Sequence, residues 1–100
     1  MQDLHVHQTL LSVSGLTERG LFNSNLLLVE TERAMMRCAD EVVLLADHTK
    51  VGRPALAFLC EWSEIDLLVI DRKLEDRKKS MLAQTGARLL IAGDLEEFGR

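Results

Sequence analysis

The chain has 100 residues, of which 47% are hydrophobic and 28% charged, a composition typical of a folded globular protein rather than a disordered one. Its net charge of −4 disfavours nonspecific binding to nucleic acid, because neutralising phosphates requires clustered Lys and Arg. The apolar runs fall far short of the ~20 residues that cross a bilayer, and neither a secretory signal nor a disulfide framework is present. We therefore expect a cytoplasmic protein with no membrane partner.

The first part of the chain predicts a strand, a loop and a helix. The strand covers residues 4–13 and the loop residues 14–20. Asn25 or Ser24 can cap a helix that runs to about residue 40, because either side chain accepts hydrogen bonds from the first backbone N–H groups. Helical spacing predicts that its buried face contains Thr31, Met35 and Cys38, with Ala39 beside them.

Three later segments share one design, a short apolar run that stops at an aspartate. They are residues 41–47, 65–71 and 88–94. Apolar runs without strict alternation are typical of strands buried on both faces, as in a parallel sheet. They recur at intervals of roughly 24 residues, long enough for a crossover connection between parallel neighbours.

The segments between these runs predict helices. Pro54 suits the first turn of a short helix through Cys60, because proline lacks the N–H group that would be unpaired there. Another helix covers about residues 74–85 and ends at Gly86. The side chains it is expected to bury are Leu74, Met81 and Leu82. The predicted fold class is α/β, an open, mostly parallel sheet with flanking helices in the order β-α-β-α-β-α-β, with residues 1–100 as a single domain.

Candidate binding residues follow from this topology, because ligands of open parallel sheets bind beyond the carboxyl ends of the strands. That rule selects Ser14 with Gly15, residues 47–50, Asp71 and Asp94. The segment after Asp47 is the most informative. Its carboxylate can hold a polyol, while Thr49, Lys50 and Arg53 can hold an anionic group. The alternative is that Asp47 caps the loop and the two cations are solvated.

The histidines can be explained without a metal site or a ligand site. His5 and His7 share one face of the first strand and could reach one metal ion. No third ligand is evident near them in sequence, and an exposed strand face explains them equally well, so we expect no metal. His48 follows a strand-end aspartate and could titrate near neutrality, but a loop position alone also explains it.

Other conspicuous residues are expected to be structural. Cys38 and Cys60 are small enough for the core. The basic stretch over residues 72–79 has interleaved acids, which is typical of a solvated helix surface. Trp62 could anchor a subunit interface or close the core of its own domain.

At the strand ends the sequence resembles the effector domain of DeoR-family transcriptional regulators. The resemblance rests on residues 14–20, 30–36 and 45–53, and continues through residues 62–66 and 69–71. Its most specific element is the pattern Asp-x-[Ser/Thr]-Lys-x-Gly, which begins at Asp47. The similarity runs over roughly residues 4–92.

The resemblance implies a function as well as a fold. Such regulators carry an amino-terminal helix-turn-helix that binds DNA and a sensor domain that binds a phosphorylated sugar or related metabolite. The chain resembles only the carboxyl-terminal part of that sensor, so we expect contact with DNA only through a domain absent here. We also expect a homo-oligomer and no cofactor. The effector-binding residues implied are Ser14, Gly15, Glu32, Asp47, Thr49, Lys50 and Arg53.

The sensor fold is also similar to ribose-5-phosphate isomerase. Asp47 and Lys50 match its strand-end aspartate and lysine, and Glu32 falls near its catalytic glutamate. The isomerase's Asp-Gly-Ala-Asp turn, however, falls on residues 14–17, where both carboxylates are replaced. Proton transfer loses its supporting groups, which favours binding over catalysis. The alternatives are an isomerase-like enzyme with Glu32 as general base, or an oligomerisation module without a working pocket.

Overall fold

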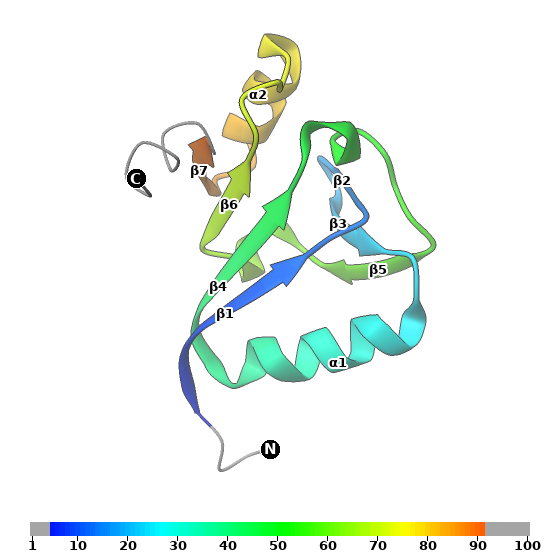
Figure 1. The fold of residues 1–100 in the computed structure, drawn as a ribbon, viewed down its shortest axis with the longest axis vertical. Helices are drawn as coiled ribbons and strands as arrows, with labels where there is room; N and C mark the ends of the chain where they lie inside the picture. Colours follow the sequence, from blue (N-terminus) through cyan, green and yellow to red (C-terminus); the bar gives the residue numbers. More distant parts are fainter. Residues whose placement is uncertain (1–4, 92–100) are drawn as a thin grey trace.

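Four parallel strands form the larger sheet of the computed structural model, which describes residues 5–91. In spatial order they are β1 (Val6–Ser12), β4 (Ala39–Ala46), β6 (Leu67–Ile70) and β7 (Arg88–Ile91) (Figure 1). All three neighbouring pairs are parallel. The predicted class, an open and mostly parallel sheet with flanking helices, is confirmed. The portion of the last predicted strand from residue 92 onward, with Asp94, lies outside the described residues.

A smaller antiparallel sheet replaces two predicted features. It consists of β2 (Gly15–Thr17), β3 (Gly20–Asn23) and β5 (Ala57–Cys60). The predicted loop over residues 14–20 is therefore wrong, because most of it belongs to the hairpin of β2 and β3. The predicted short helix through Cys60 is also wrong: it is β5, paired with β3. Ala57 and Leu59 are buried with the exposed Phe58 between them, as expected for a strand, and Cys60 at the end of β5 is also buried.

Helix α1 (Leu26–Arg37) begins where predicted but buries a different face. Asn25, not Ser24, caps it, accepting hydrogen bonds from the backbone N–H groups of Leu27 at 2.8 Å and Leu28 at 3.3 Å. The helix ends at Arg37 rather than near residue 40, since Ala39 already pairs in the parallel sheet. Its inward face is Val29, Glu32 and Met36, whereas the predicted Thr31 and Met35 are exposed.

The carboxyl-terminal helix and the tryptophan contribute to the core. α2 (Asp76–Ala83) is shorter than predicted, but Leu74 and Leu82 are buried and Met81 packs against the core as expected. Short 3-10 helices, His48–Lys50 and Trp62–Glu64, follow β4 and β5. The indole Nε1 of the buried Trp62 donates to the backbone oxygen of Thr17 at 2.7 Å. This tryptophan therefore closes the core of its own domain.

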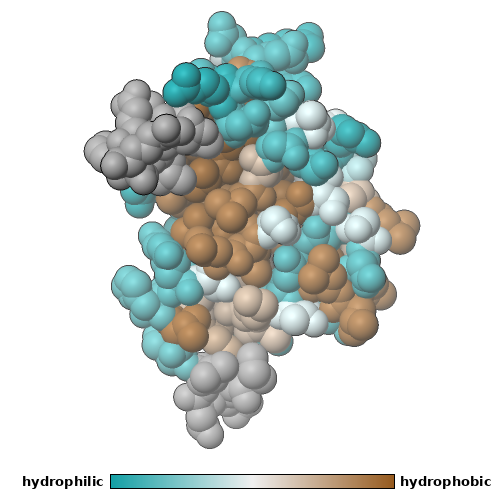
Figure 2. Space-filling model, in the orientation of Figure 1, coloured by the Kyte–Doolittle hydropathy of each residue, from teal (hydrophilic) through white to brown (hydrophobic). Residues whose placement is uncertain are grey.

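The two faces of the parallel sheet differ. Leu11, Leu44 and Leu68 point into the core, where α1, α2 and the antiparallel sheet contribute their apolar side chains. On the opposite face, Leu10 is 58% exposed and Leu45 40% exposed. Figure 2 shows apolar surface gathered over β4 and β6 on that face. No helix within residues 5–91 is long and apolar enough to span a membrane.

Candidate functional site

A pocket of about 450 Å³ lies at the carboxyl ends of β1, β4 and β6. Its walls are the last residues of these strands and the loops that follow them. The lining residues are Ser12, Val13, Leu45, Ala46, Asp47, Lys50, Val69, Ile70 and Asp71. The pocket lies at the edge where parallel sheets bind ligands. The parallel register brings the ends of β4 and β6 together, and with them Asp47 and Asp71.

Asp47 organises the loop that follows β4. Its Oδ1 accepts hydrogen bonds from the backbone N–H of Thr49 at 2.9 Å and from the Thr49 hydroxyl. The Nζ of Lys50 lies 3.8 Å from its Oδ2. The hydrogen bond from the Thr49 hydroxyl is the main cause that lowers the pKa of Asp47, and the Thr49 N–H and the Lys50 charge add to it against a smaller effect of burial. Asp47 thus caps the loop and remains an exposed, ionised carboxylate.

Asp71 is held by the loop of the neighbouring strand. Its Oδ1 accepts a hydrogen bond from the backbone N–H of His48 at 2.6 Å, and its Oδ2 lies 2.8 Å from His48 Nδ1. Burial acts to raise the pKa of Asp71, but the hydrogen bonds and charge of His48 outweigh it and lower the pKa. The strand-end rule selected Asp71, but the family resemblance did not assign it to the effector site. The structure places it in the pocket wall.

Several predicted site residues lie outside the pocket lining. Arg53 is exposed, and Thr49 does not line the pocket itself, although its hydroxyl donates to the lining residue Asp47. Gly15 packs against backbone of the same chain: a Cβ atom at this position would lie 2.0 Å from the backbone oxygen of Arg53. In this structure the glycine therefore allows the hairpin to pack closely against the backbone of residues 53–54.

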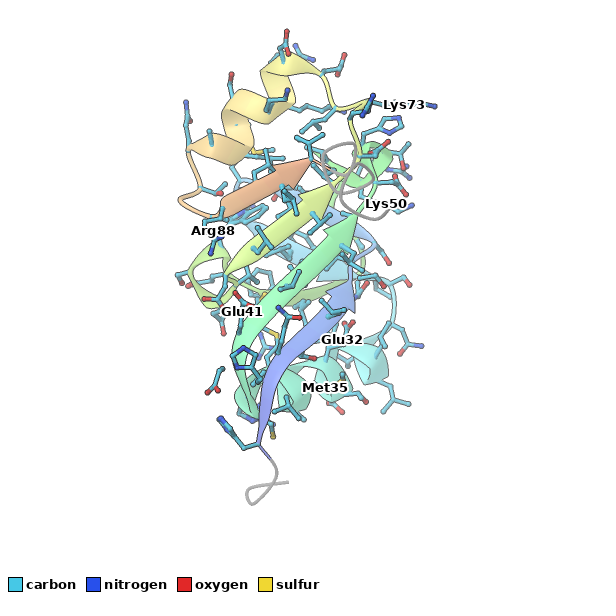
Figure 3. The ribbon with its side chains drawn as sticks, turned by 60° about the vertical axis from the view of Figure 1, so that its left-hand side comes forward. Glu32, Met35, Glu41, Lys50, Lys73 and Arg88 are labelled. Carbon is cyan, nitrogen blue, oxygen red and sulfur yellow. The ribbon has the colours of Figure 1, made fainter. Side chains whose placement is uncertain are left out.

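Ser14 and Glu32 belong to a hydrogen-bond network centred on the buried Asn23, and neither of them lines the pocket. Asn23 connects them: its Nδ2 donates to Glu32 Oε1 and to the backbone oxygen of Ser12 at 3.2 Å, and its Oδ1 accepts from Ser14 Oγ at 3.0 Å. Burial raises the pKa of Glu32, and the hydrogen bond from Asn23 offsets part of that shift. Figure 3 shows Lys50 near the ends of the strands and Glu32 apart from it, on α1.

The amino-terminal histidines pair with a carboxylate. His5 Nε2 lies 2.8 Å from Asp40 Oδ1, and His7 Nδ1 lies 3.8 Å from Asp40 Oδ2. Among residues 5–91, no group of three or more His, Cys, Asp or Glu side chains is arranged to hold a metal ion.

A parallel sheet with a charged pocket at its carboxyl edge is the arrangement of α/β domains that bind small ligands. Comparison with known families is more specific. The sequence matches the family model "DeoR C terminal sensor domain" over residues 1–72, and the chain belongs to this family.

Proteins similar to this chain are named as transcriptional regulators. The HTH-type transcriptional repressor GlcR of Bacillus subtilis (strain 168) is 32% identical over 91 residues, which cover 91% of this chain and 35% of GlcR. The HTH-type transcriptional regulator GolR of Listeria innocua is 29% identical over 93 residues, 92% of this chain and 37% of GolR. The chain therefore spans about a third of the length of these relatives.

Proposed function

We propose that this chain is the effector-sensing part of a DeoR-type transcriptional regulator, and that its pocket binds a phosphorylated sugar or related metabolite. The observation that carries the proposal is the pairing of Asp47 and Lys50 at the carboxyl edge of the sheet, with Asp71 on the neighbouring strand end. One pocket thus combines acceptors for hydroxyl groups with a cation for an anionic group. Membership of the sensor family supports the same function.

The charges of the pocket suggest how such a ligand would lie. Asp47 and Asp71 are ionised acceptors that suit sugar hydroxyls and would repel a phosphate. The phosphate is therefore assigned to the Lys50 ammonium, the cation of the pocket lining, and to the Thr49 hydroxyl, which would have to turn from Asp47 to donate to it. Charge-assisted hydrogen bonds of this kind are stronger than neutral ones.

Ligand binding would act on DNA indirectly. A ligand that binds one of two conformations better shifts the protein toward that conformation by its difference in affinity. In a regulator of this family, this shift would change DNA binding by the helix-turn-helix domain. Because such a regulator works on DNA, we assign the protein to the cytoplasm.

A thermal-shift titration tests the proposal directly. The chain is titrated with a panel of sugar phosphates, with inorganic phosphate as the reference anion. A ligand at about 100 times its dissociation constant should stabilise the fold by roughly 2.7 kcal/mol, which is several degrees for a domain of this size. A cooperative melt that no sugar phosphate shifts would contradict a working pocket.

Lys50→Ala should weaken binding of the active sugar phosphate about tenfold or more, because it removes the cation assigned to the phosphate. The melting temperature without ligand should change little, since Lys50 is a surface residue whose contact with Asp47 is long. Lys79→Ala is the matched control, because it removes the same charge from the exposed surface of α2. Equal weakening by both variants would indicate a general charge effect instead of a site.

The isomerase-like alternative has less support. A general base must reach the proton it abstracts, directly or through one water. Glu32 is buried, bound by Asn23 and absent from the pocket lining. The relatives named above are regulators, and we propose that this chain is not an enzyme. Incubation with ribose 5-phosphate should produce no ketose, even at protein concentrations at which the sugar binds.

Self-association is a second proposed role, favoured by the exposed face of the parallel sheet. Leu10 and Leu45 are exposed there, and β1 is an edge strand whose outer side is open to pairing among the described residues. We propose that the chain forms homo-oligomers. Light scattering should give a mass above 11.3 kDa, and Leu10→Lys should lower it. A monomer at micromolar concentration would contradict this role.

A further inference from the structure

Asn23 forms a buried link between the pocket wall and helix α1. It is 2% exposed at the end of β3, and Glu32 is 5% exposed on α1. The two N–H groups of the Asn23 amide serve two acceptors, the backbone oxygen of Ser12 and the Glu32 carboxylate. Its oxygen accepts from the Ser14 hydroxyl. Donors and acceptor of this side chain are thus all engaged.

The carboxylate determines which way this amide points. An ionised carboxylate only accepts hydrogen bonds, so Glu32 requires the nitrogen of Asn23 on its own side. The oxygen of Asn23 is then directed to the Ser14 hydroxyl, and the second N–H to the carbonyl of Ser12. Rotating the amide by half a turn would bring its oxygen against two acceptors. Glu32 and the Ser12 carbonyl together therefore fix the orientation of Asn23.

The segment held by Asn23 is a wall of the pocket. Ser12 and Val13 line the pocket at the end of β1, and Ser14 follows immediately. The backbone N–H of Ser14 donates to the oxygen of Phe22 at 3.0 Å, which ties the same segment to the hairpin. Asn23 thus holds this segment through hydrogen bonds without itself lining the pocket.

We propose that Glu32 and Asn23 are positioning residues of the ligand pocket: the buried carboxylate orients the amide, and the amide holds residues 12–14 in the shape that the ligand requires. The inference rests on the proposed function of the pocket. It assigns Glu32 a role different from ligand contact and from general base catalysis. Burying a carboxylate on a helix face costs free energy that an apolar side chain would avoid, and such exceptions to good packing are expected where a site is built.

Binding measurements with matched variants test the proposal. Glu32→Leu removes the acceptor at similar volume, Asn23→Leu removes the amide, and a double variant removes both. Glu32→Gln is the conservative variant, because its amide oxygen can still accept from Asn23. Val29→Ala is the control, since it loosens the buried face of α1 without touching the network. The dissociation constant for ribose 5-phosphate is measured by calorimetry well below the melting temperature of each variant.

Each leucine variant should weaken binding about tenfold, the effect of losing one or two hydrogen bonds that shape the site. The double variant should bind no more weakly than the single ones, because the two residues act through each other. Glu32→Gln should stay within about twofold of the native chain, and Val29→Ala should bind as the native chain does. Native affinity in Glu32→Leu, or additive losses in the double variant, would overturn the proposal. Equal loss in Glu32→Gln and Glu32→Leu would mean that the charge of Glu32 acts on the ligand itself.

Hydrogen exchange separates this inference from the proposed function. If neither the native chain nor its Lys50→Ala variant binds any sugar phosphate, the proposed function fails. Hydrogen exchange measured without ligand still tests the positioning role. In Glu32→Leu, the Ser14 amide should exchange about tenfold faster while the amides of β6 keep their protection. A uniform change across both regions would show that Glu32 supports only global stability, and the positioning role would be wrong.

Discussion

Two regions of this domain carry carboxylates in opposite environments. At the pocket, Asp71 is about one-third exposed (34%), and hydrogen bonds from His48 lower its pKa although burial acts against them. Outside the pocket lining, Glu32 is almost completely buried, and burial raises its pKa although Asn23 donates to it. The pocket carboxylate is partly exposed to solvent and accepts from two donor groups of His48. The buried one has the single donor group of Asn23 in place of water.

The difference shows how one chemical group serves two purposes. An exposed carboxylate with a lowered pKa stays ionised and keeps lone pairs available to a ligand. A buried carboxylate with a raised pKa is expensive to maintain and is fixed in place by its donor. Changes at Glu32 should therefore affect mainly folding and the shape of the pocket. Changes at Asp71 should affect mainly ligand contact.

The largest effect on stability is expected from Asn23→Leu. It leaves the Glu32 carboxylate buried without its donor, which should lower the free energy of unfolding by about 3 kcal/mol at pH 7. Loss of the donor should raise the pKa of Glu32 further, so the destabilisation should shrink as the pH falls and Glu32 becomes protonated. Urea denaturation at pH 5 and pH 8 measures both effects.

The double variant Asn23→Leu with Glu32→Leu is the control for that prediction. Replacing both partners with apolar groups removes the unpaired charge, so most of the lost stability should return. Binding of the sugar phosphate should nevertheless stay weak, because the pocket wall has lost its anchor. A double variant as unstable as Asn23→Leu alone would show that the amide packs the core in its own right.

Glu32→Gln should have a smaller effect of opposite sign. The neutral amide keeps an acceptor for Asn23 and avoids the cost of burying charge, so stability at pH 8 should rise by about 1 kcal/mol. In the native chain, the raised pKa means that the stability associated with Glu32 is present below the ordinary value of 4.5 and is lost as the pH rises through the folded-state value. The advantage of the variant should therefore disappear toward pH 4.

Denaturation at several pH values checks this prediction, with Glu30→Gln as its control. Glu30 lies on the same helix and is exposed, so its substitution should leave stability nearly unchanged at every pH. A Glu32→Gln variant less stable than the native chain across the whole pH range would contradict the prediction. The hydrogen bond between the carboxylate and Asn23 would then contribute more to stability than burial of the charge costs.

The parallel sheet was predictable from the sequence because buried parallel strands are nearly continuous apolar runs. The antiparallel sheet was not. A four-residue run such as Ala57–Cys60 does not distinguish a strand from a helix by periodicity, and Pro54 before it suggested a helix start. The hairpin has one signal in the sequence, the two polar residues between Thr17 and Gly20 that form its turn. The buried face of α1 was misjudged because it contains a carboxylate, Glu32, while the apolar Met35 is exposed.

The candidate site also has one part that the sequence predicts and one part that it does not. The strand-end rule finds Asp47, Lys50 and Asp71 because it depends only on where an apolar run stops. The link through Asn23 depends on how α1 folds back against β3, and no local pattern marks an asparagine at a strand end as the partner of Glu32. The family resemblance therefore implied a direct role of Glu32 in binding, and in the structure Glu32 is buried against Asn23 and does not line the pocket.

Asp71→Asn should have the smallest effect on folding and a clear effect on binding. Solvent screens the pair with His48, so the loss of stability at pH 7 should stay below about 1 kcal/mol and shrink further in salt. Because the pKa of Asp71 is lowered, its contribution is present above the ordinary value of 3.8 and is lost as the pH falls through the folded-state value. Affinity for the sugar phosphate should fall about tenfold, since the substitution removes a charged acceptor from the pocket. A stability loss above about 2 kcal/mol with unchanged affinity would place Asp71 with Glu32 among the carboxylates that shape the fold, and the contrast between the two regions would no longer hold.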